Sequence, residues 1–377
     1  MFNFELVSRA FCCLCLVFVA NCGGSGVSGG PSSVSQSYNY SQGQKSSEGA
    51  ATEALAQNDR RFSLPYRAPD GNFYSTLAKA HVSLNGIGTD LVATADTRAR
   101  NAWKDGWTGK GVKIGVADSF NTNGVIDAHG DWVAIVAASV APEANFGYQN
   151  VLGSYSLLGL IGNVNAAYDY FERNGYHIVN NSWGIERPER GWDGGYTGRS
   201  WADFDELVRE SAAAFDPNDP SSAKGLYIMA AGNGGQYCYT RRVERCNWVA
   251  AVTDSIRKKG YTNSGSRLVF VGALDDNGVS LASYSYYAGN LKNDFIVAND
   301  DVLSKGDAAG TSFAAPRVAG AAALVKQKFP SLTSAQIKQV LLQTADDLGS
   351  TGVDAIYGHG KLNVMNALSP QGKVVPK

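Results

Sequence analysis

The stretch with the clearest chemical potential runs from Gly310 to Gly320, where small residues surround one hydroxyl, that of Ser312. It leads into the apolar segment 321–325, so we expect Ser312 at the start of a buried helix, with Pro316 tolerated because it lies in the first turn. Free backbone N–H groups at a helix start favour negative charge, as a nucleophile and the oxyanion that it generates require. A serine here also serves commonly as a helix cap, so this stretch alone leaves both interpretations open.

The order of residues in this stretch, Gly-Thr-Ser-x-Ala-x-Pro followed by Val-Ala-Gly, resembles the nucleophile motif of the subtilisin-like serine peptidases. That family places an Asp, a His, an oxyanion-binding Asn and the Ser in this order along the chain. The resemblance covers about residues 97–370. It implies the α/β, subtilisin-like three-layer fold, with a largely parallel, doubly wound, seven-stranded sheet and helices on both faces.

Asp118 closes an apolar run that is typical of a strand, and His129 opens the sequence His-Gly-Asp-Trp-Val-Ala. Taken alone, an Asp at a strand end is often a turn former. Both segments resemble the family's acid and base motifs, so the resemblance implies that His129 takes the proton of Ser312 while Asp118 orients the imidazole. The segments depart from the motifs at Phe120, Asp131 and Trp132. The interval of 11 residues from Asp118 to His129 is short for this family, so their connection must be tight.

Two further apolar runs end in residues that resemble the family's substrate-binding segments. The first, from 226, ends in Ala-Ala-Gly-Asn, and the resemblance implies that the amide of Asn233 donates to the oxyanion formed on the scissile carbonyl. The second, from 177, ends in Ser-x-Gly, which in the family lines the substrate groove. The implied substrate-binding residues are Ser182, Trp183, Gly184, Ala230, Ala231 and Gly232. Trp183 is also open to interpretation as an ordinary core residue.

The elements that must position these residues alternate between strand-like and helix-like patterns. This alternation itself argues for an α/β fold with a largely parallel sheet. Apolar runs predict strands at 112–119, 177–184, 226–234, 268–274 and 295–298. Helical spacing predicts helices at 94–103, 163–173 and 201–215. A capping box of Thr333 with Gln336 predicts a further helix that begins beside it.

The composition excludes several classes of partner. The chain has 377 residues and a formal charge of −1, with 33 Lys and Arg against 34 Asp and Glu, so neither nucleic acid nor an anionic surface is indicated. Hydrophobic residues make up 44%, which suits one large domain. No cofactor is implied and no acidic spacing is diagnostic of a metal, although loop acids such as Asp216 and Asp219 leave structural calcium open.

The N-terminal residues 1–22 have the layout of a secretory signal, with Arg9 before an uncharged run and Cys22 before Gly and Ser. The end of this leader resembles a bacterial lipoprotein box, which implies lipidation of Cys22, although Asn21 replaces the usual small residue. Lipidation and simple cleavage are therefore both open. The expected localisation is extracytoplasmic, either secreted or as a lipoprotein of the outer membrane or cell surface, and membrane contact is expected only through such an anchor.

The remaining chain divides by composition. We expect a Gly- and Ser-rich disordered tether at 23–60, an N-terminal extension or removable propeptide at 61–96, the catalytic domain at 97–370 and a C-terminal tail at 371–377. Segment 357–364 resembles the closing segment of subtilases, particularly the protease domains of bacterial autotransporters. Cys238 and Cys246 alone follow the leader, and we interpret them as one local disulfide, with two free thiols as the alternative.

These features predict a serine endopeptidase that acts on proteins or peptides through a Ser-His-Asp triad. The short interval and the substitutions beside His129 leave a second class open, a subtilase-like lipoprotein that binds a peptide or a partner without cleaving it. An esterase with the same triad is a lesser alternative. Activity on simple esters without peptide cleavage distinguishes it.

Overall fold

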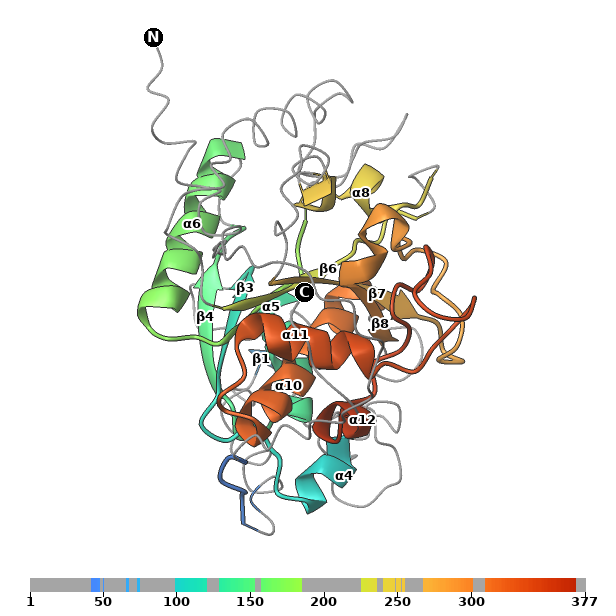
Figure 1. The fold of residues 1–377 in the computed structure, drawn as a ribbon. Helices are drawn as coiled ribbons and strands as arrows, with labels where there is room; N and C mark the ends of the chain where they lie inside the picture. Colours follow the sequence, from blue (N-terminus) through green and yellow to red (C-terminus); the bar gives the residue numbers. More distant parts are fainter. Residues whose placement is uncertain are drawn as a thin grey trace, which may run out of the picture.

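The fold is an α/β sandwich around one parallel sheet (Figure 1). The structure is a computed structural model that describes residues 42–47, 50, 66–67, 73–74, 99–120, 129–152, 157–184, 225–235, 240–247, 249–251, 253–254, 267–300 and 309–370. Several features named above lie outside these residues: Cys22, the predicted helix 201–215, Asp216, Asp219 and Cys238. The predicted fold class is confirmed.

The central sheet has six parallel strands in the order β4-β3-β5-β6-β7-β8. Its strands are β3 (Lys113–Asp118), β4 (Asn145–Asn150), β5 (Ile178–Asn181), β6 (Leu226–Ala230), β7 (Leu268–Leu274) and β8 (Phe295–Asn299). Because β3 pairs with β4 on one side and with β5 on the other, the sheet grows in both directions from β3. The five apolar runs predicted as strands are therefore strands of this sheet. In the described residues the parallel sheet has six strands, where the resemblance implies seven. A separate antiparallel pair joins β1 (Tyr66–Arg67) to β2 (Phe73–Tyr74).

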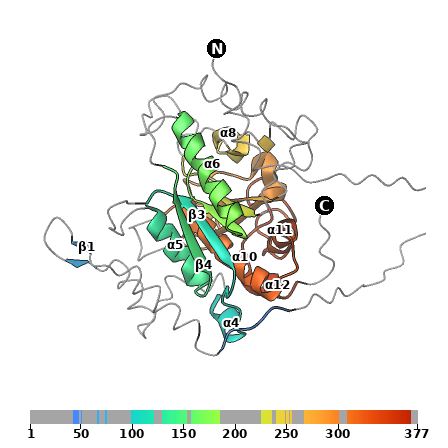
Figure 2. The ribbon, with the colours of Figure 1, turned by 90° about the vertical axis from the view of Figure 1, so that its left-hand side faces the viewer.

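Helices cover both faces of the sheet. On one face α10 (Thr311–Lys328) packs across β5 to β8, beside α5 (His129–Val140) and α11 (Ser334–Gln343). On the other face α6 (Leu157–Arg173) packs over β3 and β4, as Figure 2 shows. The shorter elements are α4 (Ala99–Lys104), α8 (Val243–Cys246), the 3-10 helix η1 (Gly289–Asp294) and α12 (Val364–Leu368). None of the helices in these described ranges is long and apolar enough to cross a membrane.

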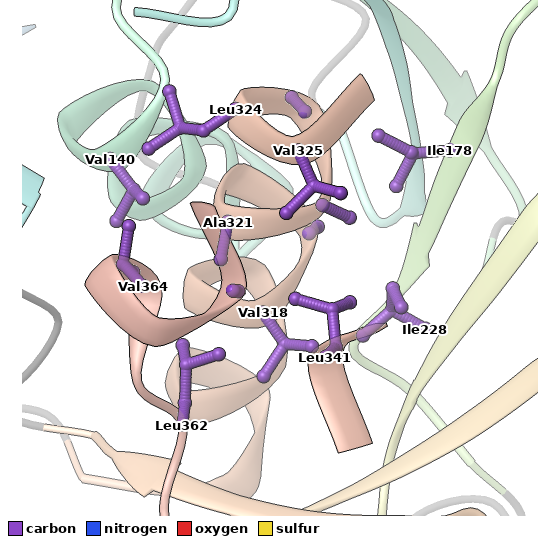
Figure 3. Close-up of a cluster of buried hydrophobic side chains, with 14 of the residues drawn as sticks. Val140, Ile178, Ile228, Val318, Ala321, Leu324, Val325, Leu341, Leu362 and Val364 are labelled. Atoms are coloured by element: carbon purple, nitrogen blue, oxygen red, sulfur yellow. The ribbon is translucent and has the colours of Figure 1, made fainter. Parts of the chain in front are cut away.

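Side chains along each strand alternate between the cores of the two faces. In β6, Ile228 belongs to the cluster around α10, whereas Tyr227 belongs to the cluster on the other face, where its ring meets that of Tyr168 at 4.9 Å between centroids. In β5 to β8 this period of two leaves no exposed face, so these strands are buried on both sides, whereas β4 at the edge of the sheet is only partly buried. Figure 3 shows the cluster around α10, with Val325 on the side of Ile178 in β5.

Small residues let α10 lie close to its neighbours. A side-chain carbon added at Gly320 would lie 2.6 Å from Cβ of Val140 in α5, so only glycine permits this approach of the two helices. α10 is therefore held along its length by close packing.

The capping box that opens α11 is confirmed: the backbone N–H of Gln336 donates to Oγ1 of Thr333 at 3.3 Å, and that of Thr333 donates to Oε1 of Gln336 at 2.9 Å.

Candidate active site

Asp118 and His129 form a hydrogen-bonded pair at the carboxyl end of the sheet. Asp118 ends β3 and is fully buried, and His129 is the first residue of α5. Nδ1 of His129 lies 2.7 Å from Oδ1 of Asp118, and the N–H of Ser119 donates to the same oxygen at 2.7 Å. An ionised carboxylate only accepts, so Nδ1 carries the proton and Nε2 of the neutral imidazole keeps a lone pair. The interval of 11 residues is thus long enough to bring the two side chains together.

Ser312, the second residue of α10, is 9% exposed. Its Oγ donates to the backbone carbonyl of Ser182 at 2.9 Å, and within the described residues no hydrogen bond joins Oγ to His129. The imidazole of His129 nevertheless lies beside the ring of Phe313, the residue after Ser312, with centroids 5.7 Å apart. Catalytic hydrogen bonds are often absent or long until substrate binds, and rotation about the Cα–Cβ bond redirects this hydroxyl.

Pro316 lies inside α10 rather than in its first turn, so the sequence-based placement of this proline is wrong. Because proline has no N–H, the carbonyl of Ser312, four residues earlier, lacks its usual helical donor. Oγ of Ser182 donates to that carbonyl at 2.7 Å, and Nδ2 of Asn180 donates to Oγ of Ser182 at 2.9 Å. Ser182 therefore replaces the bond that Pro316 removes, and the two serines are joined by two hydrogen bonds.

Asn233 lies directly against the start of α10. Its Oδ1 accepts from both the N–H and the hydroxyl of Thr311, each at 2.9 Å, and this hydroxyl in turn accepts from the N–H of Gly232 at 3.0 Å. Because Oδ1 is occupied by these donors, the amide orientation is fixed with Nδ2 on the opposite side. A side chain at Gly310 would reach to 3.0 Å from Nδ2, so glycine permits the close approach of the helix start to this amide.

The predicted substrate-binding residues follow two neighbouring strands, β5 and β6, whose pairing sets their ends side by side. Ser182, Trp183 and Gly184 follow β5, and Ala230 to Gly232 end β6 or follow it. Trp183 is 7% exposed and belongs to the core cluster on the α6 face, which supports the core interpretation, and its role in substrate binding stays a prediction.

Asn247 is a buried residue of this region that the sequence did not single out. Its Nδ2 donates to the carbonyl of Ala231 at 3.2 Å, and a side chain at Gly184 would reach to 3.1 Å from the same nitrogen. Asn247 therefore fixes the positions of the chain just after β5 and just after β6. Its Oδ1 also accepts the N–H of Ala250 at 3.2 Å, a local bond typical of a helix cap, but its contact with Ala231 joins positions 16 residues apart and leaves no pattern in the sequence. Among the described residues, no group of three or more His, Cys, Asp and Glu is arranged to hold a metal ion.

Comparisons with known proteins identify the family to which this fold belongs. Residues 114–360 match the Subtilase family. The chain is 29% identical over 300 residues to subtilisin BL of Lederbergia lenta, covering 71% of this chain and 94% of that protein. It is 24% identical over 349 residues to an extracellular serine protease of Serratia marcescens, covering 72% of this chain and 33% of that protein. The crystal structure of MycP1 with its N-terminal propeptide removed superposes with a TM-score of 0.51 at 21% identity, covering 74% of this chain and 97% of that one.

The matched residues include β3 to β8 and the start of α10, which together carry Asp118, His129, Asn233 and Ser312. The match spans well over half of the chain and contains the parallel sheet except for Lys113, the first residue of β3. The chain therefore belongs to the subtilase family of serine endopeptidases.

Proposed function

We propose that this subtilase cleaves peptide bonds with Ser312 as the nucleophile, His129 as the general base and Asp118 as the residue that orients the imidazole. The observation that carries the proposal is the bond of 2.7 Å between the buried Asp118 and Nδ1 of His129. It leaves Nε2 as the basic nitrogen next to the start of α10, where Ser312 stands. The positive end of the helix dipole at that helix start favours the oxyanion.

The proposed reaction has two halves. Oγ of Ser312 attacks the scissile carbonyl while its proton passes to Nε2 of His129, and the oxyanion is held by Nδ2 of Asn233 and the N–H of Ser312. The tetrahedral intermediate then collapses, the C–N bond breaks and the leaving amine takes the proton from His129. Water repeats the sequence on the acyl-enzyme and releases the acid. Main-chain groups of 182–184 and 230–232 line the proposed groove for the substrate.

A fluorophosphonate probe tests the nucleophile directly. We expect wild-type protein to be labelled with loss of fluoride, and Ser312→Ala to be unlabelled. His129→Ala should be labelled at least about 1000-fold more slowly, because the hydroxyl then lacks its base. Casein cleavage should vanish in both variants. A folded wild-type protein that takes no label would instead support the alternative, a subtilase-like protein that binds a peptide without cleaving it. The observation that favours this alternative is that Oγ of Ser312 bonds to Ser182 rather than to His129.

We also propose that the enzyme is exported through residues 1–22 and acts outside the cytoplasm, either secreted or tethered by a lipid on Cys22. The similarity to an extracellular serine protease of Serratia marcescens supports export. We keep 97–370 as the proposed catalytic domain and 61–96 as an extension or propeptide. Mass spectrometry of the mature N-terminus tests both points, since lipidated Cys22, unmodified Cys22 and a start near residue 97 have different masses.

A disulfide between Cys238 and Cys246 is proposed for the loop after Asn233. Cys246 is fully buried at the end of α8 and is disulfide-bonded, and Cys238 is the other cysteine after the leader, which supports this pairing. Peptide mapping without reduction should recover the two cysteines in one cross-linked fragment. Two alkylated cysteines in unreduced protein would favour free thiols.

A further inference from the structure

Asp300 connects the end of β8 to the residue that precedes the nucleophile helix. It follows β8 directly and is 6% exposed. Its Oδ2 accepts the N–H of Gly310 at 2.6 Å, across ten residues of sequence. A hydrogen bond from a backbone N–H to a carboxylate is roughly twice as strong as one between neutral groups. The bond therefore fixes Gly310 relative to the end of β8, which lies at the edge of the described sheet.

Tyr284 links the same carboxylate to the segment that carries Asn233. Its hydroxyl donates to Oδ2 of Asp300, and its backbone carbonyl accepts the N–H of Gly235 at 2.8 Å. A side chain at Gly235 would reach to 2.6 Å from that carbonyl, so the two segments meet at backbone contact distance. Asp300 and Tyr284 thus join the chain just after Asn233 to the chain just before Ser312.

The position of Gly310 determines the geometry of the oxyanion donors. Thr311, the next residue, donates twice to Oδ1 of Asn233, and the α-carbon of Gly310 lies beside Nδ2 of the same amide. A shift of Gly310 therefore moves Ser312 and Asn233 relative to each other. Misplacement of a reacting group by about 1 Å costs about 100-fold in rate.

We infer that Asp300 is a positioning residue for the nucleophile: its carboxylate, held by Tyr284, fixes Gly310 and so aligns Ser312 with the amide of Asn233. The inference rests on the proposed roles of Ser312 and Asn233. It requires an oxygen acceptor at position 300 and does not require the charge itself. Asp300→Asn keeps that acceptor, Asp300→Ala removes it and Tyr284→Phe removes only its support.

The test measures kcat and KM on a peptide substrate, the rate of fluorophosphonate labelling, and Tm for each variant. We expect Asp300→Ala to lower kcat and the labelling rate by about 100-fold with KM within about twofold, because the misalignment affects the transition state. Asp300→Asn should keep kcat within about fivefold of wild type, and Tyr284→Phe should fall between the two. In the Asp300→Ala background, Tyr284→Phe should have no further effect on kcat, since both act through one bond.

Asp354→Ala is the matched control. This carboxylate also accepts backbone N–H groups, from Ile356 at 2.7 Å and Tyr357 at 2.8 Å, but its loop bonds to the start of β8 through His359 and Phe295, at the opposite end of the strand from Asp300. It should lower Tm without changing kcat.

Three results decide the inference. If Asp300→Ala lowers Tm like the control and keeps wild-type kcat, the residue is only structural and the inference fails. If Asp300→Ala does not fold, the other two variants decide. A wild-type kcat in Tyr284→Phe together with a 100-fold loss of kcat in Asp300→Asn then overturns the inference. If the wild-type protein itself takes no label, the proposed function fails before Asp300 is tested.

Discussion

Ser182 supplies the hydrogen-bond donor that the carbonyl of Ser312 lacks because of Pro316. A proline in a helix interior costs about 3 kcal/mol, partly because a carbonyl loses its donor. Here that carbonyl belongs to Ser312, and the hydroxyl of Ser182 donates to it at 2.7 Å. The proline and the serine therefore act as a unit: the first leaves the carbonyl of the reacting residue without a helical donor, and the second donates to it from the end of β5.

Ser182→Ala should therefore lower the free energy of unfolding by about 1–3 kcal/mol, because it leaves a buried carbonyl without a donor and Asn180 without an acceptor. Adding Pro316→Ala should restore most of the loss, since an N–H returns to the helix at the right place. Urea unfolding of both single variants and the double variant measures this coupling. Strictly additive changes in the three variants would contradict it. Ser182→Thr, which keeps the hydroxyl, serves as the control.

At the scale of elements, the site is assembled at one edge of the sheet. Parallel strands bring their carboxyl ends together, and ligands of open α/β sheets bind outside these ends. Asp118 ends β3, Ser182 follows β5, Asn233 follows β6 and Asp300 follows β8. The start of α10 bonds to Ser182 and Asn233, and Gly310 just before it bonds to Asp300. Phe313 lies beside His129, the partner of Asp118. The starts of two helices, α5 with His129 and α10 with Ser312, and four strand ends are thus sufficient to place every group of the proposed mechanism.

The sequence predicts these elements well because strands buried on both faces are continuous apolar runs, and three of them stop at a residue with a motif: Asp118, Ser182 and Asn233. Contacts between distant positions leave no such pattern. The bond from Ser182 to the carbonyl of Ser312 spans 130 residues, and that from Asn247 to Ala231 spans 16. In the sequence, Asp300 is indistinguishable from an ordinary loop acid, because its bond to Gly310 spans ten residues. The interior position of Pro316 is missed for the same reason, since its compensation comes from another strand.

The opposite end of the sheet carries a histidine whose titration should affect stability. His177 precedes β5, and its Nδ1 accepts the N–H of Lys113 at 3.3 Å. Burial lowers the pKa of His177 below its usual 6.5, helped by the positive charges of Lys326 and Lys113. The folded state therefore binds fewer protons than the unfolded state as the pH falls below that value, so stability is full above it and is lost on acidification.

We expect the free energy of unfolding to decrease from about pH 7 to about pH 5, and His177→Gln, which keeps an acceptor for Lys113, to flatten this decrease. His359 is also buried with a lowered pKa, so His177→Gln with His359→Gln should be flatter still. Urea titrations at several pH values provide the measurement. A slope in His177→Gln as steep as in wild type would show that His177 does not contribute.

At the scale of the whole molecule, α10 connects the active site to the place where an N-terminal segment docks. With 18 residues the helix is about 27 Å long, with Ser312 at its start and Gln327 near its end. Oε1 of the buried Gln327 accepts from the N–H groups of Thr108 and Gly109, at 2.7 and 2.8 Å. Its Nε2 donates to the carbonyls of Gln44 and Gly106, at 3.0 and 3.1 Å.

Segment 42–47 fits this place closely. The N–H of Gly43 donates to the carbonyl of Lys328 at 2.9 Å, and a side chain at Gly43 would collide with the carbonyl of Gln327 at 1.8 Å. Lys45 lies over the ring of Trp107, with Nζ 5.5 Å from its centroid. A glycine, a buried amide and a stacked cation thus hold a segment that is remote in sequence from the catalytic domain.

Gln327→Leu should lower the free energy of unfolding by about 2–4 kcal/mol, because it leaves several buried backbone groups without partners, whereas kcat should stay unchanged because the site is a helix length away. Gly43→Val should lower the free energy of unfolding by less than Gln327→Leu does, since it displaces only segment 42–47.

A synthetic peptide of residues 40–48, added to protein truncated before residue 50, should raise Tm, and the same peptide with Gly43→Val should not. Gln343→Leu, the same change at an exposed position of α11, is the control. If Gln327→Leu unfolds no earlier in urea than Gln343→Leu, the amide does not hold this end of the molecule together.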